Sequence, residues 1–82
     1  MSLSVLVIED EPEFADYLRR GLTYDGYQVR LAYSAETGLE EIRRSQPDLI
    51  IFDVMLPIMD GFTACRHLRE SGYTGPVLML TA

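Results

Sequence analysis

The sequence of 82 residues contains no lysine and no tryptophan, and it has a single cysteine, Cys65. One cysteine excludes an internal disulfide and a zinc site built from several cysteines, and it is typical of a reducing cytoplasm. Basic residues are also scarce, since seven arginines face thirteen acidic residues and the formal net charge is -6. This charge balance argues against direct binding to nucleic acid or to an anionic membrane surface.

Long apolar segments are absent as well. No run approaches the roughly 18 apolar residues of a membrane-spanning helix, and no basic segment precedes the first apolar run. We therefore expect no membrane span, no secretory signal and a cytoplasmic location. The composition is 48% hydrophobic and 24% charged, which is typical of a folded domain. Its length predicts one small domain with a correspondingly small core.

The most informative stretch of the chain runs from residue 49 to residue 61. Leu49–Phe52 is an apolar run with no polar face, which predicts a buried parallel strand, and it ends at Asp53. Pro57 prevents a continuing ladder, and Asp60 is expected to cap a following helix. A second apolar strand, Leu3–Ile8, ends in the same way at Glu9 and Asp10. Open α/β sheets place their ligands at the carboxyl ends of such strands.

Helical and strand patterns alternate along the rest of the chain. Proline at position 12 starts a first helix, which Asp25-Gly26 stops, and Ser34 caps a second. Residues 27–32 alternate and predict an edge strand, while Val77–Leu80 predicts a fourth strand after Gly72 ends the third helix. Three βαβ units in succession predict a parallel sheet between helices, with right-handed crossovers.

The same patterns predict which helical side chains face the core and which pair in solvent. The predicted inner faces are Phe14, Leu18 and Leu22 in the first helix, Ala35, Leu39 and Ile42 in the second, and Phe62, Cys65 and either Leu68 or Arg69 in the third. Glu40 and Arg44 are spaced to form an exposed ion pair. His67 has no nearby cysteine or histidine, so a metal role for it is not expected.

Three segments of the sequence together resemble the response-regulator receiver domain of bacterial two-component signalling. They are Val5–Glu11, Asp53–Gly61 and Pro76–Ala82. The resemblance implies a flavodoxin-like, doubly wound parallel sheet of order 2-1-3-4. It also implies that residues 1–82 are a receiver domain truncated after the fourth strand, without the fifth strand and the two helices that flank it. The sequence of these segments further resembles regulators that carry a winged-helix DNA-binding output domain, so DNA contact is expected only through a domain absent here.

A metal and phosphoryl site follows from the same resemblance. Strand order 2-1-3-4 brings Glu9, Asp10 and Asp53 to one sheet edge, where three carboxylates repel unless one takes up a proton or a cation binds. The resemblance implies Mg²⁺ held by Asp10, Asp53 and the backbone carbonyl of Met55, with Glu9 acting through water. Asp53 is then expected to accept a phosphoryl group from a histidine kinase, and Thr81 to hydrogen-bond a phosphoryl oxygen. The family's phosphoryl-binding lysine has no counterpart among these residues.

The expected role is therefore a phosphoacceptor signalling module and not an enzyme. Two alternatives stay open: a non-phosphorylated α/β interaction module, and a Mg²⁺-dependent phosphohydrolase that uses Asp53. The second is weak, because hydrolases with a similar nucleophile want another aspartate two residues later, where this chain has Met55. An uncharged fourth strand without a pairing partner also predicts self-association of the chain.

Overall fold

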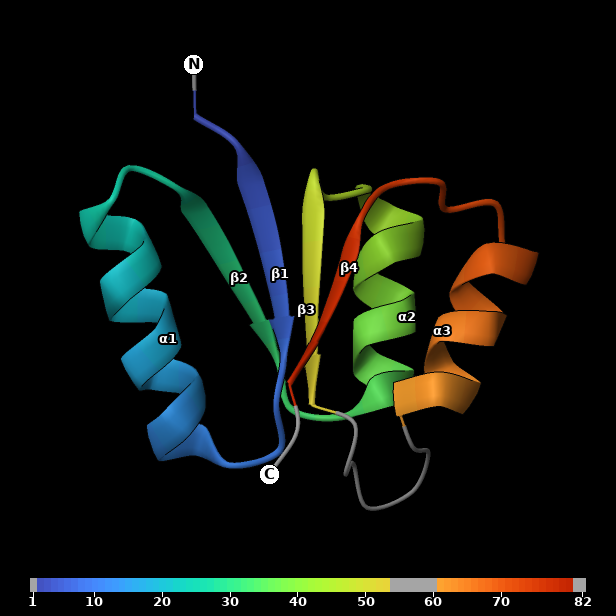
Figure 1. Cartoon of the computed structure of the whole chain (residues 1–82), viewed down its shortest axis with the longest axis horizontal. Coiled ribbons are helices and arrows are strands. Elements are labelled where there is room, and N and C mark those ends of the chain that lie inside the picture. The colour runs from blue at the N-terminus through green and yellow to red at the C-terminus, as the bar shows by residue number, and fades with distance from the viewer. Residues whose placement is uncertain (1, 54–60, 81–82) are drawn as a thin grey trace.

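The computed structural model describes residues 2–53 and 61–80 and holds strands and helices in strict alternation (Figure 1). The elements in chain order are β1 (Ser4–Ile8), α1 (Pro12–Tyr24), β2 (Gln28–Ala32), α2 (Ala35–Arg44), β3 (Leu49–Asp53), α3 (Gly61–Glu70) and β4 (Val77–Leu80). The predicted strands and helices are confirmed, and the strand bounds differ from the predicted ones by at most one residue. Within the described residues, no helix has the length and apolar character needed to cross a membrane.

The four strands form one parallel sheet in the order β2-β1-β3-β4. Val7 of β1 pairs with Leu31 on one side and with Ile51 on the other, so β1 and β3 are the central strands. Among the described residues, β2 and β4 are the edges, which confirms the predicted edge position of β2. The order agrees with the flavodoxin-like arrangement that the resemblance implied.

Helices cover the two faces of the sheet unequally (Figure 1). The face under α2 and α3 holds one large core, which includes Leu6, Ile50 and Phe52 from the strands and Leu68 from α3. The opposite face, under α1, has a smaller buried core of Val5, Val7 and Ile51, flanked by half-buried side chains. The central strands thus contribute alternate residues to both cores, as buried parallel strands do.

Local chemistry fixes where the helices begin and end. Pro12 occupies the first turn of α1, where its missing N–H is not needed. The Ser34 hydroxyl accepts a hydrogen bond from the Thr37 N–H at 3.1 Å, which confirms the predicted cap of α2. Gly26 and Gly72 follow α1 and α3 with φ of 98° and 99°, a left-handed conformation that favours glycine. The predicted cap at Asp60 lies outside the described residues.

Two predictions about helix surfaces are wrong. Phe14 is 41% exposed and stacks on Tyr17, whereas Ala15 is fully buried beside the sheet. The sheet-facing positions are therefore 15, 18 and 22, because a small residue lets the helix approach the strands closely. Arg44 pairs with Glu41 at 2.6 Å and not with Glu40, since Arg30 also draws the Glu41 carboxylate toward β2 at 3.2 Å.

The predicted inner faces of the other two helices are largely confirmed. Ala35 and Ile42 are buried, and Leu39 packs against the same core from a half-buried position. In α3, Leu68 is fully buried and Cys65 is half-buried. The side chain of Phe62 lies outside the part of the chain whose side chains the structure describes.

Candidate functional site

The carboxyl ends of the two central strands bring three acidic side chains together. Ile8 pairs with Phe52 in the β1–β3 ladder. The residues that follow this pair, Glu9 and Asp53, therefore lie side by side at the end of the two strands. One carboxylate oxygen from each of Glu9, Asp10 and Asp53 lies within 4.8 Å of the others. The predicted convergence of these residues is confirmed, and we call them the acid cluster. It lies at the edge of the sheet where parallel α/β folds place ligands.

Glu9 is the most buried of the three. It is only 3% exposed, which makes it the buried charged residue of the described part of the chain. Its backbone N–H donates to the Ala32 carbonyl at 2.9 Å, which extends the β1–β2 pairing by one residue. Its Oε1 accepts a hydrogen bond from the Glu11 N–H at 3.2 Å. The side chain therefore connects the strand end to the residue that precedes α1.

The environment of the acid cluster works against three separate negative charges. Burial raises the pKa of Glu9 to about 7, and a hydrogen bond and charge from Asp53 and the charge of Asp10 add to the rise. The Glu11 N–H opposes this rise, because it donates to the Glu9 carboxylate. The expectation that one acid of the cluster takes up a proton agrees with this raised pKa.

The donor set fits a single hard cation. All three ligand groups are carboxylates, and Mg²⁺ and Ca²⁺ prefer oxygen ligands. Opposite ligands of an octahedral Mg²⁺ stand about 4.2 Å apart, since each Mg–O distance is about 2.1 Å. Neighbouring ligands of the same ion stand about 3 Å apart, so a bound ion would draw the three acidic oxygens, which lie within 4.8 Å of one another, closer together. A bound cation would offset the burial and the acidic charges that raise the Glu9 pKa.

Two further residues of the predicted site cannot be placed. Met55, whose carbonyl was expected to bind the metal, and Thr81, expected to bind the phosphoryl group, lie outside the described residues. The third helix places His67 on an exposed surface, and no metal-binding group of the described residues includes it.

One contact in the site was missed by sequence reasoning. The bond from the Glu11 N–H to Glu9 substitutes for a helix cap, because Glu11 is the N-cap of α1 and makes no side-chain cap of its own. A signal was present in the sequence. The N-cap position of α1 holds none of the usual capping residues, serine, threonine, aspartate or asparagine. An acceptor side chain two residues before the N-cap, such as Glu9, can then accept a hydrogen bond from the N-cap N–H.

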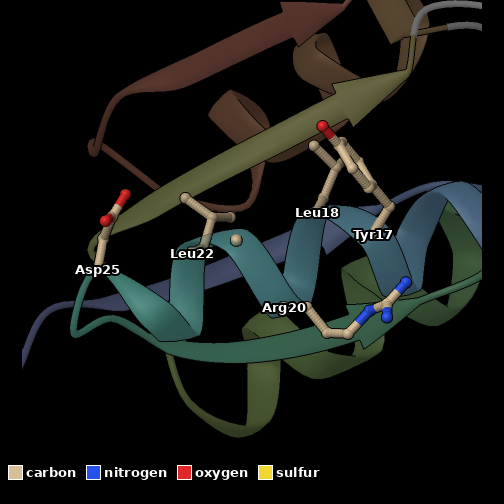
Figure 2. Close-up of a pocket in the computed structure, with 6 residues that line it drawn as sticks. Tyr17, Leu18, Arg20, Leu22 and Asp25 are labelled. Atoms are coloured by element: carbon tan, nitrogen blue, oxygen red, sulfur yellow. The ribbon is translucent and has the colours of Figure 1, made fainter.

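A hollow on α1 lies away from the acid cluster. It has a volume of about 570 Å³ and is lined by Tyr17, Leu18, Arg20, Gly21, Leu22 and Asp25, so it contains no member of the acid cluster. Figure 2 shows Leu18 and Leu22 extending from the helix on its sheet side. The hollow is open to solvent, and its lining comes from α1 and from Asp25, which follows it.

A parallel sheet of order 2-1-3-4 with acids at the ends of its first and third strands defines a class, the receiver modules of two-component signalling. The family model for the response regulator receiver domain matches residues 5–82. The chain belongs to this family. The resemblance inferred from the sequence is thereby confirmed over nearly the whole length of the chain.

Two curated relatives can be aligned over all or nearly all of this chain. The chain is 43% identical over 82 residues to the response regulator MprA of Mycobacterium ulcerans, covering 100% of this chain and 35% of that protein. It is 47% identical over 78 residues to the transcriptional regulatory protein PcoR of Escherichia coli, covering 95% of this chain and 34% of that protein. The chain thus spans about a third of the length of these curated relatives.

Solved structures confirm the flavodoxin-like fold. The receiver domain of the Francisella response regulator 1452 superposes with a TM-score of 0.93 at 27% identity, covering 99% of this chain and 67% of that one. The chemotaxis response regulator CheY4 of Vibrio cholerae gives a TM-score of 0.91 at 30% identity, covering 96% of this chain and 68% of that one.

Proposed function

We propose that the chain is a phosphoacceptor module that receives a phosphoryl group from a histidine kinase on Asp53, with Mg²⁺ bound at the acid cluster. The observation that carries the proposal is the convergence of three carboxylates within 4.8 Å at the carboxyl edge of the sheet. Asp53 stands at the end of the central strand β3 and is half-exposed, so an incoming donor can reach it. Membership in the receiver family supports the same role.

In the proposed reaction, a carboxylate oxygen of Asp53 attacks the phosphorus of a phosphohistidine. A new O–P bond forms, the P–N bond breaks, and the imidazole leaves with a proton from solvent. Mg²⁺, when bound, neutralises the charge that develops on the phosphoryl oxygens. Asp10, Asp53 and the Met55 carbonyl are the proposed ligands, Glu9 acts through water, and Thr81 binds a phosphoryl oxygen. The phosphoryl-binding lysine of the family has no counterpart among residues 1–82.

The module would act as a relay and not as an enzyme with turnover on a separate substrate. MprA is a response regulator and PcoR a transcriptional regulatory protein, and each is about three times the length that this chain covers. We infer that regulation of transcription by this module would require a winged-helix DNA-binding domain beyond these residues. A net charge of -6 supports the view that the module itself does not contact DNA.

The test is to incubate the protein with Mg²⁺ and a small phosphodonor and to map the labile adduct. We expect the adduct on Asp53 and its loss in Asp53→Asn. Asp48→Asn, an exposed aspartate just before β3, is the matched control and should be phosphorylated like the unaltered protein. An adduct on Asp10 or Asp60 that survives Asp53→Asn would overturn the assignment. Mg²⁺ binding without any adduct would favour the non-phosphorylated interaction module instead.

Self-association of the chain is a second proposal, and it rests on β4. This edge strand contains no charge and no proline, and its side chain Leu78 is 52% exposed. Such an edge can pair with another chain through its free backbone groups. A second copy would at the same time cover part of the open face beside α1.

A further inference from the structure

We propose that the outer edge of β2 binds an extended peptide in which acidic and apolar residues alternate, and that the peptide adds to the sheet as a further strand. Among the described residues, β2 is one of the two edges of the sheet (Figure 1). The proposal does not depend on phosphoryl transfer, because it uses neither Asp53 nor any other member of the acid cluster. It rests on the backbone of β2, on the side chains of its two faces and on the charge beside it.

The backbone of β2 has free hydrogen-bonding groups on its outer side. The Gln28 N–H and the Ala32 carbonyl both bond to β1, each at 2.9 Å. Because the direction of hydrogen bonding alternates along a strand, the N–H and C=O groups of Val29 and Leu31 point away from β1. The described residues provide no partner for these outward groups. Such an edge is a template for the backbone of an added strand.

The two faces of β2 offer different side chains to an added strand. Val29 and Leu31 pack against the smaller core on the α1 face. Arg30, which lies between them, points to the α2 face, where its guanidinium bonds to Glu41 Oε1 at 3.2 Å. Side chains that lie on the same face of neighbouring strands interact directly. A matching strand therefore carries apolar residues on the α1 face and, alternating with them, residues that suit arginine on the α2 face.

The α2 side of this edge carries an excess of positive charge. A groove of about 410 Å³ lies there and has Gln28, Arg30, Glu41 and Arg44 in its lining. Glu41 lies 3.2 Å from Arg30 and 2.6 Å from Arg44, so one carboxylate faces two guanidinium groups. The Arg44 side chain is 75% exposed and keeps donors for a further acid. The groove thus favours glutamate or aspartate at the positions that alternate with apolar ones.

The guanidinium of Arg30 is already held in place. It donates to the Ser45 carbonyl at 2.6 Å and to the Glu41 carbonyl at 3.3 Å, which fixes it at the end of α2. Little side-chain entropy is then lost when a ligand binds. One more acid, Asp48, accepts a bond from the N–H of the lining residue Ser4 at 2.7 Å. It precedes β3, which lies beyond β1 from the β2 edge, so it leaves the excess of positive charge at the edge.

The same charge argues against a second copy of the chain as the occupant. Two β2 edges that paired with each other would bring the Arg30 side chains of both copies together, and like charges on facing strands are unfavourable. The edge strand β4 contains no charged residue and has no such barrier. The two edges therefore differ in the partner that they accept, and β2 fits an acidic peptide.

The first test titrates the protein with a short fluorescein-labelled peptide of alternating valine and glutamate, blocked at both ends, and follows fluorescence anisotropy. One control peptide replaces glutamate by lysine. A second control has the same composition, but its valines and glutamates form separate blocks. We expect each control peptide to bind about tenfold more weakly, because the first reverses the charge and the second loses the alternation between the two faces.

A matched pair of arginines tests the role of the groove. Arg44→Glu should weaken binding of the alternating peptide about tenfold. Arg43→Glu makes the same charge change on an exposed neighbour that does not line the groove, so it should stay within about threefold of the unaltered protein. Val29→Pro removes an outward N–H without removing a bond to β1, which an edge strand tolerates, and should also weaken binding about tenfold. Val29→Ala is its control and keeps the N–H.

Amide hydrogen exchange measured by NMR tests strand addition directly, and it needs no variant to fold. Saturating peptide should slow exchange at Val29 and Leu31 about tenfold and leave Arg30, which already faces β1, unchanged. Binding without protection at Val29 and Leu31 would overturn the proposal, as would equal affinities for the glutamate and lysine peptides or equal affinities of Arg44→Glu and Arg43→Glu. Protection that grows with protein concentration in the absence of peptide would make a second copy the occupant and would also overturn it.

Discussion

The two faces of the sheet differ in how completely they are covered. Under α2 and α3, side chains such as Leu6, Ile50, Phe52 and Leu68 are fully buried. On the α1 face, Val5, Val7 and Ile51 form a smaller buried core, while Leu18 and Leu22 remain half-buried beside an open hollow. The same four strands thus support one closed core and one partly open one. Stability should therefore be concentrated on the face that α2 and α3 cover.

The acid cluster lies where this difference matters for function. Its residues end the two central strands, whose alternate side chains contribute to both cores. Glu9 connects it to the start of α1, the helix on the less covered face. We infer that the closed core fixes the strand ends, whereas the open face can adjust to a partner. Each prediction below breaks or sharpens this contrast.

The largest expected effect comes from a matched pair of leucines on opposite faces. Leu68→Ala removes a fully buried side chain under α3 and should lower the free energy of unfolding by about 3 kcal/mol. Leu18→Ala removes a half-buried side chain of α1 and should lower the free energy of unfolding by only about 1 kcal/mol, because Leu18 buries less apolar surface than Leu68. Urea unfolding at one pH measures both. Equal costs would contradict the proposed asymmetry.

A pH effect of similar size should arise from Glu9. Its folded pKa of about 7 exceeds the ordinary value of 4.5, so the folded chain binds the proton more tightly than the unfolded chain. The contribution of Glu9 to the free energy of unfolding should therefore be greatest below pH 4.5. It should fall by about 3 kcal/mol as the pH rises to 7 and above. Unfolding in a chelating buffer across this range provides the measurement. Glu9→Gln should flatten the dependence, and a slope retained in that variant would locate the cause elsewhere.

A smaller effect is expected on the open face. Leu78→Glu places a charge at the exposed centre of β4 and should weaken self-association by about tenfold, because burying an unpaired charge at an edge is unfavourable. Leu3→Glu is the control, since Leu3 is similarly exposed at 55% but lies outside the strands. Sedimentation over a range of concentrations gives the association constants. A chain that stays monomeric at high concentration would remove the basis for this proposal.

The smallest expected difference concerns the two acids that follow β1. Asp10→Asn removes a proposed direct ligand and should weaken Mg²⁺ binding by about tenfold, whereas Glu9→Gln, acting through water, should weaken it by about threefold. Titration of both variants with Mg²⁺, followed by NMR of the backbone amides, tests this order. The reverse order would make Glu9 the direct ligand and Asp10 the outer one.

Much of the fold and of the acid cluster could be predicted from the sequence alone. Apolar runs ending at Glu9 and at Asp53 set the central strands, because a strand without a polar face must be buried on both sides. Gly26, Ser34 and Gly72 set helix ends through backbone freedom and a hydroxyl acceptor. Strand order came from resemblance to a family, and it brought the acids together.

Tertiary structure decided the features in which several local choices were nearly equal. The helical period allows either Phe14 or Ala15 to face the sheet beside Leu18 and Leu22, and close docking on the strands selects the smaller Ala15. Spacing allows Arg44 to meet Glu40 or Glu41, and Arg30 on β2 selects Glu41.

The hydrogen bond that the Glu11 N–H donates to the Glu9 carboxylate also depends on tertiary structure. It forms where the strand end and the helix start enclose the carboxylate, and the same enclosure raises the pKa of Glu9. Sequence by itself determined which residues are buried in the strands and which acids reach the sheet edge, because these follow from local pattern and chain order. Packing decided the partners of each helix and of Glu9, because those depend on distances between segments that sequence spacing does not set.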